Sequence, residues 1–375
     1  MGKRLLFVVN VDWFFLSHRL PLALAAQQKG FEIHVAVGCT DSVKILKEYG
    51  FIVHEVLIPR GRSNLFKEIR AFFQILGVLS NVKADVIHLV TIKPVIYGGI
   101  AAKIIGANRV VSAISGLGHA FVAKGLKASL VRAVVSLAYK IALSHKDQTI
   151  IFQNSTDRDC LTRIAGVSAE KTIIVKGSGV DLRLYEMSDL PGGVPCVVMA
   201  SRLLSDKGVW QYVEAAGILK GRGLRARFCL VGDIDPGNPT SLSSDDLKTI
   251  ESQEVVELLG HRTDMNKIMK SATIVTLPSF YGEGLPKVLI EAAASGRPIV
   301  TTDMPGCRDS VTAGVTGLII PPRDSIALAD ALEMLLQNPE LCTSMGKSAR
   351  TKAENEFDIN IIVQDHVNIY EGSGK

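Results

Sequence analysis

The sequence predicts an α/β fold built from two doubly wound parallel sheets. Short runs rich in Val and Ile alternate with helix-length segments along all 375 residues. Continuous apolar runs of this kind are typical of strands buried on both faces, as parallel sheets require. A stretch rich in Pro and Gly, "EMSDLPGGVPC", interrupts the alternation from residue 186 to residue 196. Because the length suits two domains of ordinary size, we interpret this stretch as a linker between them.

The strand candidates divide into two sets around the linker. The first set comprises residues 4–10, 31–38, 52–58, 84–90, 109–115, 149–154 and 172–177. The second comprises residues 196–201, 227–232, 255–260, 273–279, 298–303 and 317–322. We therefore predict a first domain over 1–186, a linker over 187–196, a second domain over 197–356 and a final helix over 357–375. Ligands of such folds bind at the carboxyl ends of the strands, and we expect a cleft between the domains.

Cysteine usage and the N-terminus bear on the cellular compartment. The six cysteines are scattered and form no CxxC or Cys/His pattern, which favours reduced thiols in an intracellular protein and no zinc site. The opening stretch "MGKRLLFVVNVDWFF" has an apolar run, but Asp12 interrupts it and no small-residue cleavage site follows. We interpret this stretch as a first strand and not as a signal peptide.

The net charge of +5 conceals a difference between the two halves. Residues 1–190 hold 24 basic against 14 acidic residues, a balance of +10, whereas the remainder holds 18 against 23, a balance of −5. The first half therefore favours an anionic partner or surface.

Two helical segments of the first half could meet a membrane surface. Residues 124–146 carry five basic residues and no acidic residue before Asp147, around an apolar core too short to span a bilayer. This helix could lie on an anionic membrane, or it could be a core helix with a solvated basic edge. The sequence of the segment favours the two alternatives about equally. The aromatic cluster of residues 65–79 could also face lipid, although its pattern favours packing.

The second half opens with a strand–loop–helix junction that carries two cations. Arg202 and Lys207 sit at the two ends of the loop in "SRLLSDKG", at the carboxyl edge of the predicted sheet. Two cations there suit a diphosphate leaving group, whose charge grows as the bond to it breaks. Alone, the pair would be indistinguishable from ordinary surface cations.

A second junction, "SFYGEGLPKVLIEAAASG", adds two carboxylates. Glu283 lies in the glycine turn and Glu291 about a turn and a half into the following helix, whose first turn Pro286 suits. The N-terminus of that helix favours an anion. A glutamate on the buried side of a helix is costly unless a polar group meets it, and sugar hydroxyls would do so. We include Ser279, at the start of this junction, among the donor-binding residues.

These motifs resemble those of the retaining glycosyltransferases of family four, and the resemblance covers essentially the whole chain. It is carried by the spacing of Glu283 and Glu291, by the "SRLLSDKG" loop and by "GSGVD" at 177–181. The resemblance implies the GT-B fold, two Rossmann-like domains facing a central cleft, with the last helix crossing back to the first domain. It implies a nucleotide diphosphate bound by Arg202 and Lys207, a donor sugar at Glu283, and ribose hydroxyls at Glu291. It further implies sugar and phosphate contacts from the backbone of Gly284 and Leu285, and a base framed by His261 and Arg262.

Further motifs resemble a bacterial subgroup of that family. "DWFFLSHRLPLA" at 12–23, "VVSAISGLGHAF" at 110–121 and "GDIDPGNP" at 232–239 are similar to enzymes that add hexosamine-type sugars to undecaprenyl-diphosphate-linked saccharides for protein glycans, O-antigen or capsule. This resemblance implies a UDP-sugar donor, a lipid-linked saccharide acceptor, and a peripheral position on the cytoplasmic face of the inner membrane. It implies no cofactor and no nucleic-acid partner.

Two features depart from the commoner family pattern. Many members have a glycine-rich loop after the first strand, whereas this chain has bulky residues over 12–19. We therefore expect the side chains of Ser17, His18 and Arg19 to contact a donor or acceptor phosphate. Many members also carry a histidine at the end of the fifth strand; here Ser115 stands there, and His119 is the candidate to replace it.

Other readings of the same residues remain open. The Asp233-x-Asp235 spacing could hold a divalent metal, but turn chemistry favours a structural loop, and we expect no essential metal. A sugar-nucleotide epimerase of the same fold, a phosphorolytic enzyme, or a non-catalytic nucleotide-sugar-binding protein could use the same donor site. The basic helix at 124–146 argues against the epimerase, and the complete Arg/Lys and Glu/Glu set argues against the non-catalytic protein.

Overall fold

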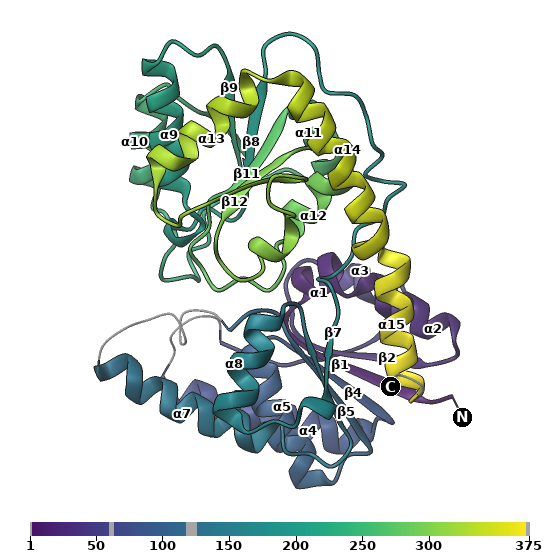
Figure 1. Ribbon diagram of the computed structural model, residues 1–375. Helices are drawn as coiled ribbons and strands as arrows, with labels where there is room; N and C mark the ends of the chain where they lie inside the picture. The colour runs from purple at the N-terminus through teal and green to yellow at the C-terminus, as the bar shows by residue number, and fades with distance from the viewer. Residues whose placement is uncertain (1, 60–63, 118–125, 373–375) are drawn as a thin grey trace. The chain divides into compact units, whose positions relative to one another are not determined.

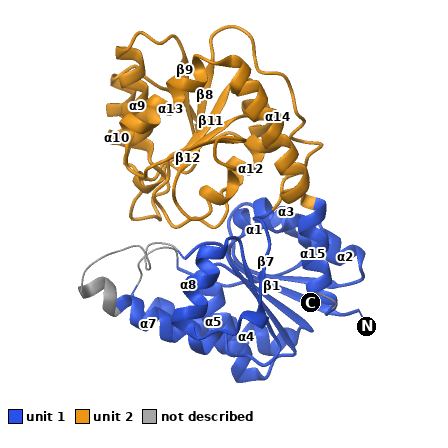
Figure 2. Ribbon diagram, in the orientation of Figure 1, with its two compact units in different colours: residues 1–178, 360–375 blue, residues 179–359 orange. Residues whose placement is uncertain are grey.

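The computed structural model describes residues 2–59, 64–117 and 126–372 (Figure 1). The chain divides into two compact units (Figure 2). Unit 1 comprises residues 1–178 and 360–375, and unit 2 comprises residues 179–359. Each contains one parallel sheet, so the predicted α/β class and its two doubly wound sheets are confirmed.

The sheet of unit 1 has seven parallel strands in the order β3-β2-β1-β4-β5-β6-β7. The strands are β1 (Arg4–Val11), β2 (Glu32–Gly38), β3 (Ile52–Glu55), β4 (Val86–Val90), β5 (Arg109–Ile114), β6 (Gln148–Phe152) and β7 (Thr172–Ile174). Its helices are α1 (Asp12–His18), α2 (Leu20–Gln28), α3 (Val43–Glu48), α4 (Leu65–Val82), α5 (Ile92–Ile105), α7 (Leu126–Ala142), α8 (Ser155–Ala165) and α15 (Ile359–Glu371), with a 3₁₀ turn η1 (Ala169–Lys171). All seven strands overlap the predicted ones.

Helices cover both faces of this sheet, because alternate residues of each central strand enter different cores. In β1, Leu6 and Val8 join one core with α4, α5, α7 and α8. Phe7 and Val9 join the other core with α1, α2, α3 and α15. Burial on both faces explains why the strand read as a continuous apolar run and not as an alternating one.

The last helix, α15, packs on the second of these cores. The hydroxyl of Tyr370 lies 2.6 Å from Nδ1 of His88 on β4, and the Tyr370 ring meets Phe7 edge to face. Burial lowers the pKa of His88 well below its usual value, so this imidazole is neutral at physiological pH. The last helix therefore completes the core of unit 1 with its apolar face and with the buried, neutral pair of His88 and Tyr370.

The sheet of unit 2 has six parallel strands in the order β10-β9-β8-β11-β12-β13. The strands are β8 (Cys196–Ala200), β9 (Arg227–Val231), β10 (Glu257–Gly260), β11 (Ile274–Leu277), β12 (Ile299–Thr302) and β13 (Gly317–Ile320). Its helices are α9 (Val209–Gly221), α10 (Ser244–Ser252), α11 (Met265–Ser271), α12 (Lys287–Ala294), α13 (Ser325–Leu336) and α14 (Pro339–Glu356), with 3₁₀ turns η2 (Ser205–Lys207) and η3 (Arg308–Ser310). These six strands also coincide with the predicted set.

Unit 2 begins earlier in the chain than the linker that we predicted. Val180 N–H donates to Phe357 O at 2.8 Å, and Ile359 N–H donates to Val180 O at 3.0 Å. These bonds attach residues 179–186 to the end of α14, so they pack with unit 2 although they precede its first strand. The Pro/Gly-rich stretch therefore lies within unit 2 and not between the units. Its composition marks irregular chain, but it does not show which unit that chain packs against.

The aromatic cluster of α4 is another point on which packing differs from expectation. Phe72 packs against the core of unit 1, but Phe66 and Phe73 are 74% and 61% exposed. The expectation that these aromatics serve packing is therefore wrong for two of the three. Among the described residues, no helix is both long enough and apolar enough to cross a bilayer.

Gly317 provides a stability test of the unit 2 sheet. It is paired with Ile299 on the neighbouring strand, and a Cβ at this position would lie 2.0 Å from Ile299 O. We expect Gly317→Ala to lower the free energy of unfolding by about 1–3 kcal/mol, because the strands would be forced apart. Thermal melting of the purified variant measures this loss.

Gly217→Ala is the matched control. Gly217 lies inside α9, and a Cβ there meets nothing within 4 Å. Since alanine favours helix, this variant should melt at or above the temperature of the parent protein. Equal melting temperatures for the two variants would contradict the close approach at Gly317.

Candidate donor site in unit 2

The two predicted motifs meet at Gly208, a position where no side chain would fit. The strands β8 and β11 are neighbours, so their carboxyl ends meet at one edge of the sheet. After β8, Gly208 adopts a φ of +83°, and a Cβ there would lie 2.2 Å from Pro278 O. Phe280 N–H donates to Asp206 O at 2.9 Å across the same contact. The "SRLLSDKG" loop is therefore held directly against the loop that carries Glu283.

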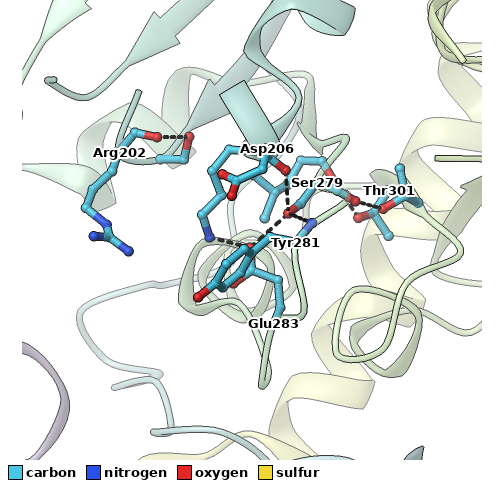
Figure 3. Close-up of polar contacts among 10 residues, drawn as sticks. Arg202, Asp206, Ser279, Tyr281, Glu283 and Thr301 are labelled. Carbon is cyan, nitrogen blue, oxygen red and sulfur yellow. Dashed lines mark hydrogen bonds and ion pairs between the residues drawn. The ribbon is translucent and has the colours of Figure 1, made fainter. Parts of the chain in front are cut away.

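Lys207 and Glu283 form an ion pair at this contact. Their side chains are only 12% and 11% exposed. Ser279 Oγ donates to the same Glu283 oxygen at 2.9 Å, and Figure 3 shows Ser279 between Asp206 and Glu283. The ammonium of Lys207 also lies 5.6 Å from the centroid of the Tyr281 ring. Three residues predicted from sequence thus form one hydrogen-bonded cluster, in which the poorly solvated charges are paired as burial demands.

The glycine turn after Glu283 packs against the loop that follows β12. A Cβ on Gly306, whose φ is +79°, would lie 1.7 Å from Gly284 O. Thr302 Oγ1, at the end of β12, donates to Ser279 O. Gly284 and Leu285 are buried, and Pro286 caps α12 with a φ of −64°. The start of α12, the positive end of its dipole, is therefore held beside Glu283.

Glu291 lies on the buried side of α12, and the structure identifies the groups that meet its carboxylate. Tyr185 donates its hydroxyl to Glu291 Oε1 at 2.8 Å, and Lys287 Nζ lies 3.7 Å from the same oxygen. Burial raises the pKa of Glu291, while Lys287 and the Tyr185 hydrogen bond oppose the rise. Sequence reasoning missed Tyr185, because it precedes Glu291 by 106 residues and no local pattern marks it.

Arg202 is paired differently from Lys207. Its guanidinium donates to Asp235 Oδ2 at 2.7 Å, and the Arg202 side chain remains 45% exposed whereas that of Asp235 is 10% exposed. Figure 3 shows Arg202 set apart from the Ser279 and Glu283 group. Asp233 accepts a hydrogen bond from Ile234 N–H instead. The Asp233-x-Asp235 loop therefore orients an arginine, and the described residues contain no cluster of three or more potential metal ligands.

The remaining donor-site prediction concerns the loop after β10. His261 and Arg262 follow the end of that strand and are exposed. Arg262 donates from Nε and Nη2 to the two carboxylate oxygens of Asp264, at 2.8 and 2.7 Å. They lie at the same edge of the sheet as Lys207 and Glu283, two strands away from β8. Their contact with a nucleotide base stays a prediction.

The residues predicted to contact phosphate in unit 1 differ in exposure, since Ser17 is exposed and Arg19 is buried. Ser17 and His18 lie on α1, where Ser17 Oγ is 2.5 Å from His18 Nδ1 and His18 stacks on Phe14. Arg19 is only 2% exposed and donates to His18 O, and burial lowers its pKa to about 10. The prediction that Arg19 contacts a phosphate does not fit this burial, because its side chain lies in the core beneath α15. His119 lies outside the described residues.

Known protein families match both units. Residues 186–352, which contain Lys207, Glu283 and Glu291, match the family Glycosyl transferases group 1. Residues 4–154 match the family Glycosyl transferase 4-like. The chain therefore carries a group 1 glycosyltransferase domain over 186–352 and a glycosyltransferase 4-like domain over 4–154. The motif resemblance to family four is thereby confirmed, and with it the expectation that this glycosyltransferase is an enzyme.

Individual relatives extend over most of the chain. The glycosyltransferase is 29% identical to the N,N'-diacetylbacillosaminyl-diphospho-undecaprenol alpha-1,3-N-acetylgalactosaminyltransferase of Campylobacter jejuni, over 95% of this chain and 97% of that one. It is 24% identical to the UDP-Gal:alpha-D-GlcNAc-diphosphoundecaprenol alpha-1,3-galactosyltransferase of Escherichia coli, over 79% and 77%. A solved structure of Anabaena HepE with UDP and glucose superimposes with a TM-score of 0.77 at 19% identity, over 99% and 100%. The GT-B fold class is thus confirmed.

The contact between Tyr185 and Glu291 can be tested by titration. A hydrogen bond to the charged form of a carboxyl lowers its pKa, so Tyr185→Phe should raise the pKa of Glu291 further above its usual value. Carbon-13 NMR of the glutamate carboxyl measures the shift. Tyr212→Phe is the control, since this hydroxyl donates to Val197 O and Cys229 O and does not contact Glu291. A Glu291 midpoint that moves equally in both variants, or in neither, would contradict the assigned contact.

Proposed function

We propose that the protein transfers a sugar, a HexNAc or a derivative, from a UDP-sugar to an undecaprenyl-diphosphate-linked saccharide with retention of anomeric configuration. The observation that carries the donor half is the cluster of Lys207, Glu283 and Ser279 beside the start of α12. It offers a cation, a helix dipole and a hydroxyl-binding carboxylate within one loop pair. The names of the two undecaprenol-acting relatives support the acceptor half.

The chemistry follows from where the charges lie. As the bond from the anomeric carbon to the diphosphate breaks, its electron pair passes to the leaving group. Lys207, Arg202 and the α12 dipole would stabilise that growing negative charge. Glu283 would accept hydrogen bonds from donor-sugar hydroxyls and Glu291 from the ribose, with the Tyr185 hydroxyl beside it. His261 and Arg262 would frame the base. The departing phosphate would take the proton of the acceptor hydroxyl, which forms its bond on the same face.

The deciding experiment is a screen of UDP-sugars against undecaprenyl-diphosphate-linked saccharides with chromatographic detection of products. Extension of the lipid-linked acceptor, with UDP released in equal amount, is the expected result. Release of an epimerised sugar nucleotide without acceptor, or of a sugar phosphate with inorganic phosphate, would instead establish one of the rival enzymes. Binding of the donor without turnover of any acceptor would contradict the proposal.

Within that screen, Lys207→Ala should lower kcat about 100-fold or more, because a preorganised charge at the leaving group is lost. Lys220→Ala is the matched control. Lys220 is an exposed lysine on α9 in the same unit, and its ammonium donates only to Glu254 O among the described partners. Circular dichroism checks that both variants are folded. Full activity of Lys207→Ala would refute its assignment to the leaving group.

We further propose that unit 1 binds the cytoplasmic face of the inner membrane as a peripheral protein. The face of α7 presents a stripe of exposed apolar residues, Val131, Val134, Leu137 and Ile141, with Lys140 exposed beside it. The α4 helix adds exposed Leu65, Phe66, Ile69 and Phe73, flanked by exposed Lys67 and Arg70. Since α5 packs against both helices, the two stripes belong to one layer of unit 1 (Figure 2). Apolar side chains among cations are what an anionic bilayer surface binds.

Replacement of two exposed apolar residues tests this surface. Val134→Asp with Leu137→Asp should weaken cosedimentation with phosphatidylglycerol-containing vesicles about tenfold or more, through lost apolar burial and added repulsion. Ile326→Asp with Met334→Asp is the control on α13, where the two side chains are similarly exposed. Unchanged vesicle binding in the α7 variant, or an equal loss in the α13 variant, would refute the membrane role of α7.

A further inference from the structure

Arg350, on α14, carries a charged side chain that is only 17% exposed. Its Nη1 donates to Tyr185 O at 2.9 Å and to Ala294 O at 2.7 Å. Its Nε donates to Glu354 Oε1, one turn further along α14, at 2.7 Å. A charge is enclosed in this way only where hydrogen bonds and a counter-charge offset its lost hydration. The guanidinium is therefore fixed in one orientation, and it joins two backbone carbonyls to α14.

The two carbonyls belong to segments that are far apart in the sequence. Tyr185 precedes Arg350 by 165 residues and lies in irregular chain, whereas Ala294 is the last residue of α12. The last carbonyls of a helix have no partner within that helix, and a cation beside them suits the negative end of the helix dipole. Arg350 thus binds the end of α12 and attaches the backbone of Tyr185 to it.

A second arginine holds the chain that follows Tyr185. Arg297, just after α12, is fully buried, and it donates to Asp189 O at 3.1 Å and to the Ser188 hydroxyl. Residues 186–190 form no helix or strand, so side chains supply hydrogen bonds that secondary structure would otherwise provide. The path of this segment is therefore set by Arg297 and Arg350.

Tyr185 is fixed at both of its ends. Its carbonyl accepts from Arg350, and its hydroxyl donates to Glu291 Oε1 at 2.8 Å. Glu291 and Ala294 are three residues apart on α12, so they lie on the same side of that helix. Tyr185 therefore reaches from the end of α12 back to the Glu291 carboxylate. A shift of its backbone would carry the hydroxyl away from that carboxylate.

We propose that Arg350 is a positioning residue for the donor nucleotide: it fixes Tyr185, which in turn orients the Glu291 carboxylate toward the ribose hydroxyls. This inference rests on the proposed function, which assigns the ribose to Glu291. Arg350 acts at the C-terminal end of α12, whereas the diphosphate would lie at the N-terminal end, about 12 Å away for a helix of eight residues. The effect of Arg350 should therefore depend on the ribose hydroxyls and not on the phosphates.

Calorimetric titration with two nucleotides tests this dependence. UDP and dideoxy-UDP, which lacks both ribose hydroxyls, are titrated into the full-length parent protein and into Arg350→Met. We expect the parent to bind UDP more tightly than dideoxy-UDP, because only UDP offers hydroxyls to Glu291. Arg350→Met should bind UDP about tenfold more weakly, the worth of one hydrogen bond, and should bind dideoxy-UDP as the parent does.

Lys352→Met is the matched control on the same helix. Lys352 is similarly enclosed and pairs with Glu356 one turn further along, as Arg350 does with Glu354. Among the described residues its ammonium donates to Glu356 and to neither Tyr185 nor Ala294. This variant should keep the parent affinity for both nucleotides. An equal loss of UDP affinity in both variants, or an equal loss for both nucleotides in Arg350→Met, would show a general structural role and overturn the inference.

A double-mutant cycle shows whether Arg350 acts through Tyr185. Tyr185→Phe should weaken UDP binding, and the addition of Arg350→Met should cause little further loss, whereas losses that add would overturn the inference. Without nucleotide, Arg350→Met should also raise the pKa of Glu291 as Tyr185→Phe does, because both weaken the hydrogen bond to the carboxylate. Carbon-13 NMR measures this pKa, and an unchanged midpoint in Arg350→Met would equally overturn the inference.

Two further outcomes are separated by the same titrations. If Arg350→Met melts below the assay temperature, Arg350→Lys replaces it, since a lysine keeps the charge but lacks the planar fork that serves both carbonyls; the same hydroxyl-dependent loss is expected. If the parent binds UDP and dideoxy-UDP equally, the assignment of the ribose to Glu291 has failed, and the inference fails with it. If the parent distinguishes them and Arg350→Met does so to the same extent, the inference alone is overturned.

Discussion

The candidate donor site depends on one steric constraint, the contact of Gly208 with Pro278. The loop after β8 lies directly against the loop after β11, and this close approach is possible because residue 208 is a glycine without a side chain. That contact brings Lys207 to Glu283 and Asp206 O to the backbone of Phe280. The helix start at α12, the Ser279 hydroxyl and the Glu283 carboxylate then fall within one region. Without that approach, the two sequence motifs would remain two unrelated strand–helix junctions.

Both cations of this site are held by carboxylates in the structure. Lys207 is paired with Glu283, and Arg202 is paired with Asp235. Such pairing fixes the cations in position before a ligand arrives, which is the condition for electrostatic stabilisation without reorganisation. The pairs differ in exposure, since Arg202 remains largely open to solvent while Lys207 is enclosed. Under the proposed function, Arg202 is the more accessible contact for an incoming diphosphate.

The two units differ in the kind of polar group at their strand ends. Unit 2 presents the charged pairs Lys207–Glu283 and Arg202–Asp235 beside its strand ends, whereas β4 and β5 of unit 1 are followed by the uncharged Thr91 and Ser115. The excess of basic residues in the first half of the chain is visible instead on helices such as α4 and α7, at Lys67, Arg70 and Lys140. Under the proposed function, the exposed cations of unit 1 suit an anionic membrane surface.

The sequence by itself determined the fold class and the approximate position of the strands, and it named the residues that meet in the candidate donor site. Strands buried on both faces have a local signature, and Arg202, Lys207, Glu283 and Glu291 lie in motifs whose spacing is itself local. Only the tertiary structure decided which groups meet them. Tyr185 reaches Glu291, and Asp235 reaches Arg202, across chain separations that no periodicity records. The burial of Arg19 under α15 and the attachment of residues 179–186 to unit 2 were equally hidden, because each depends on the return of the chain's last helices.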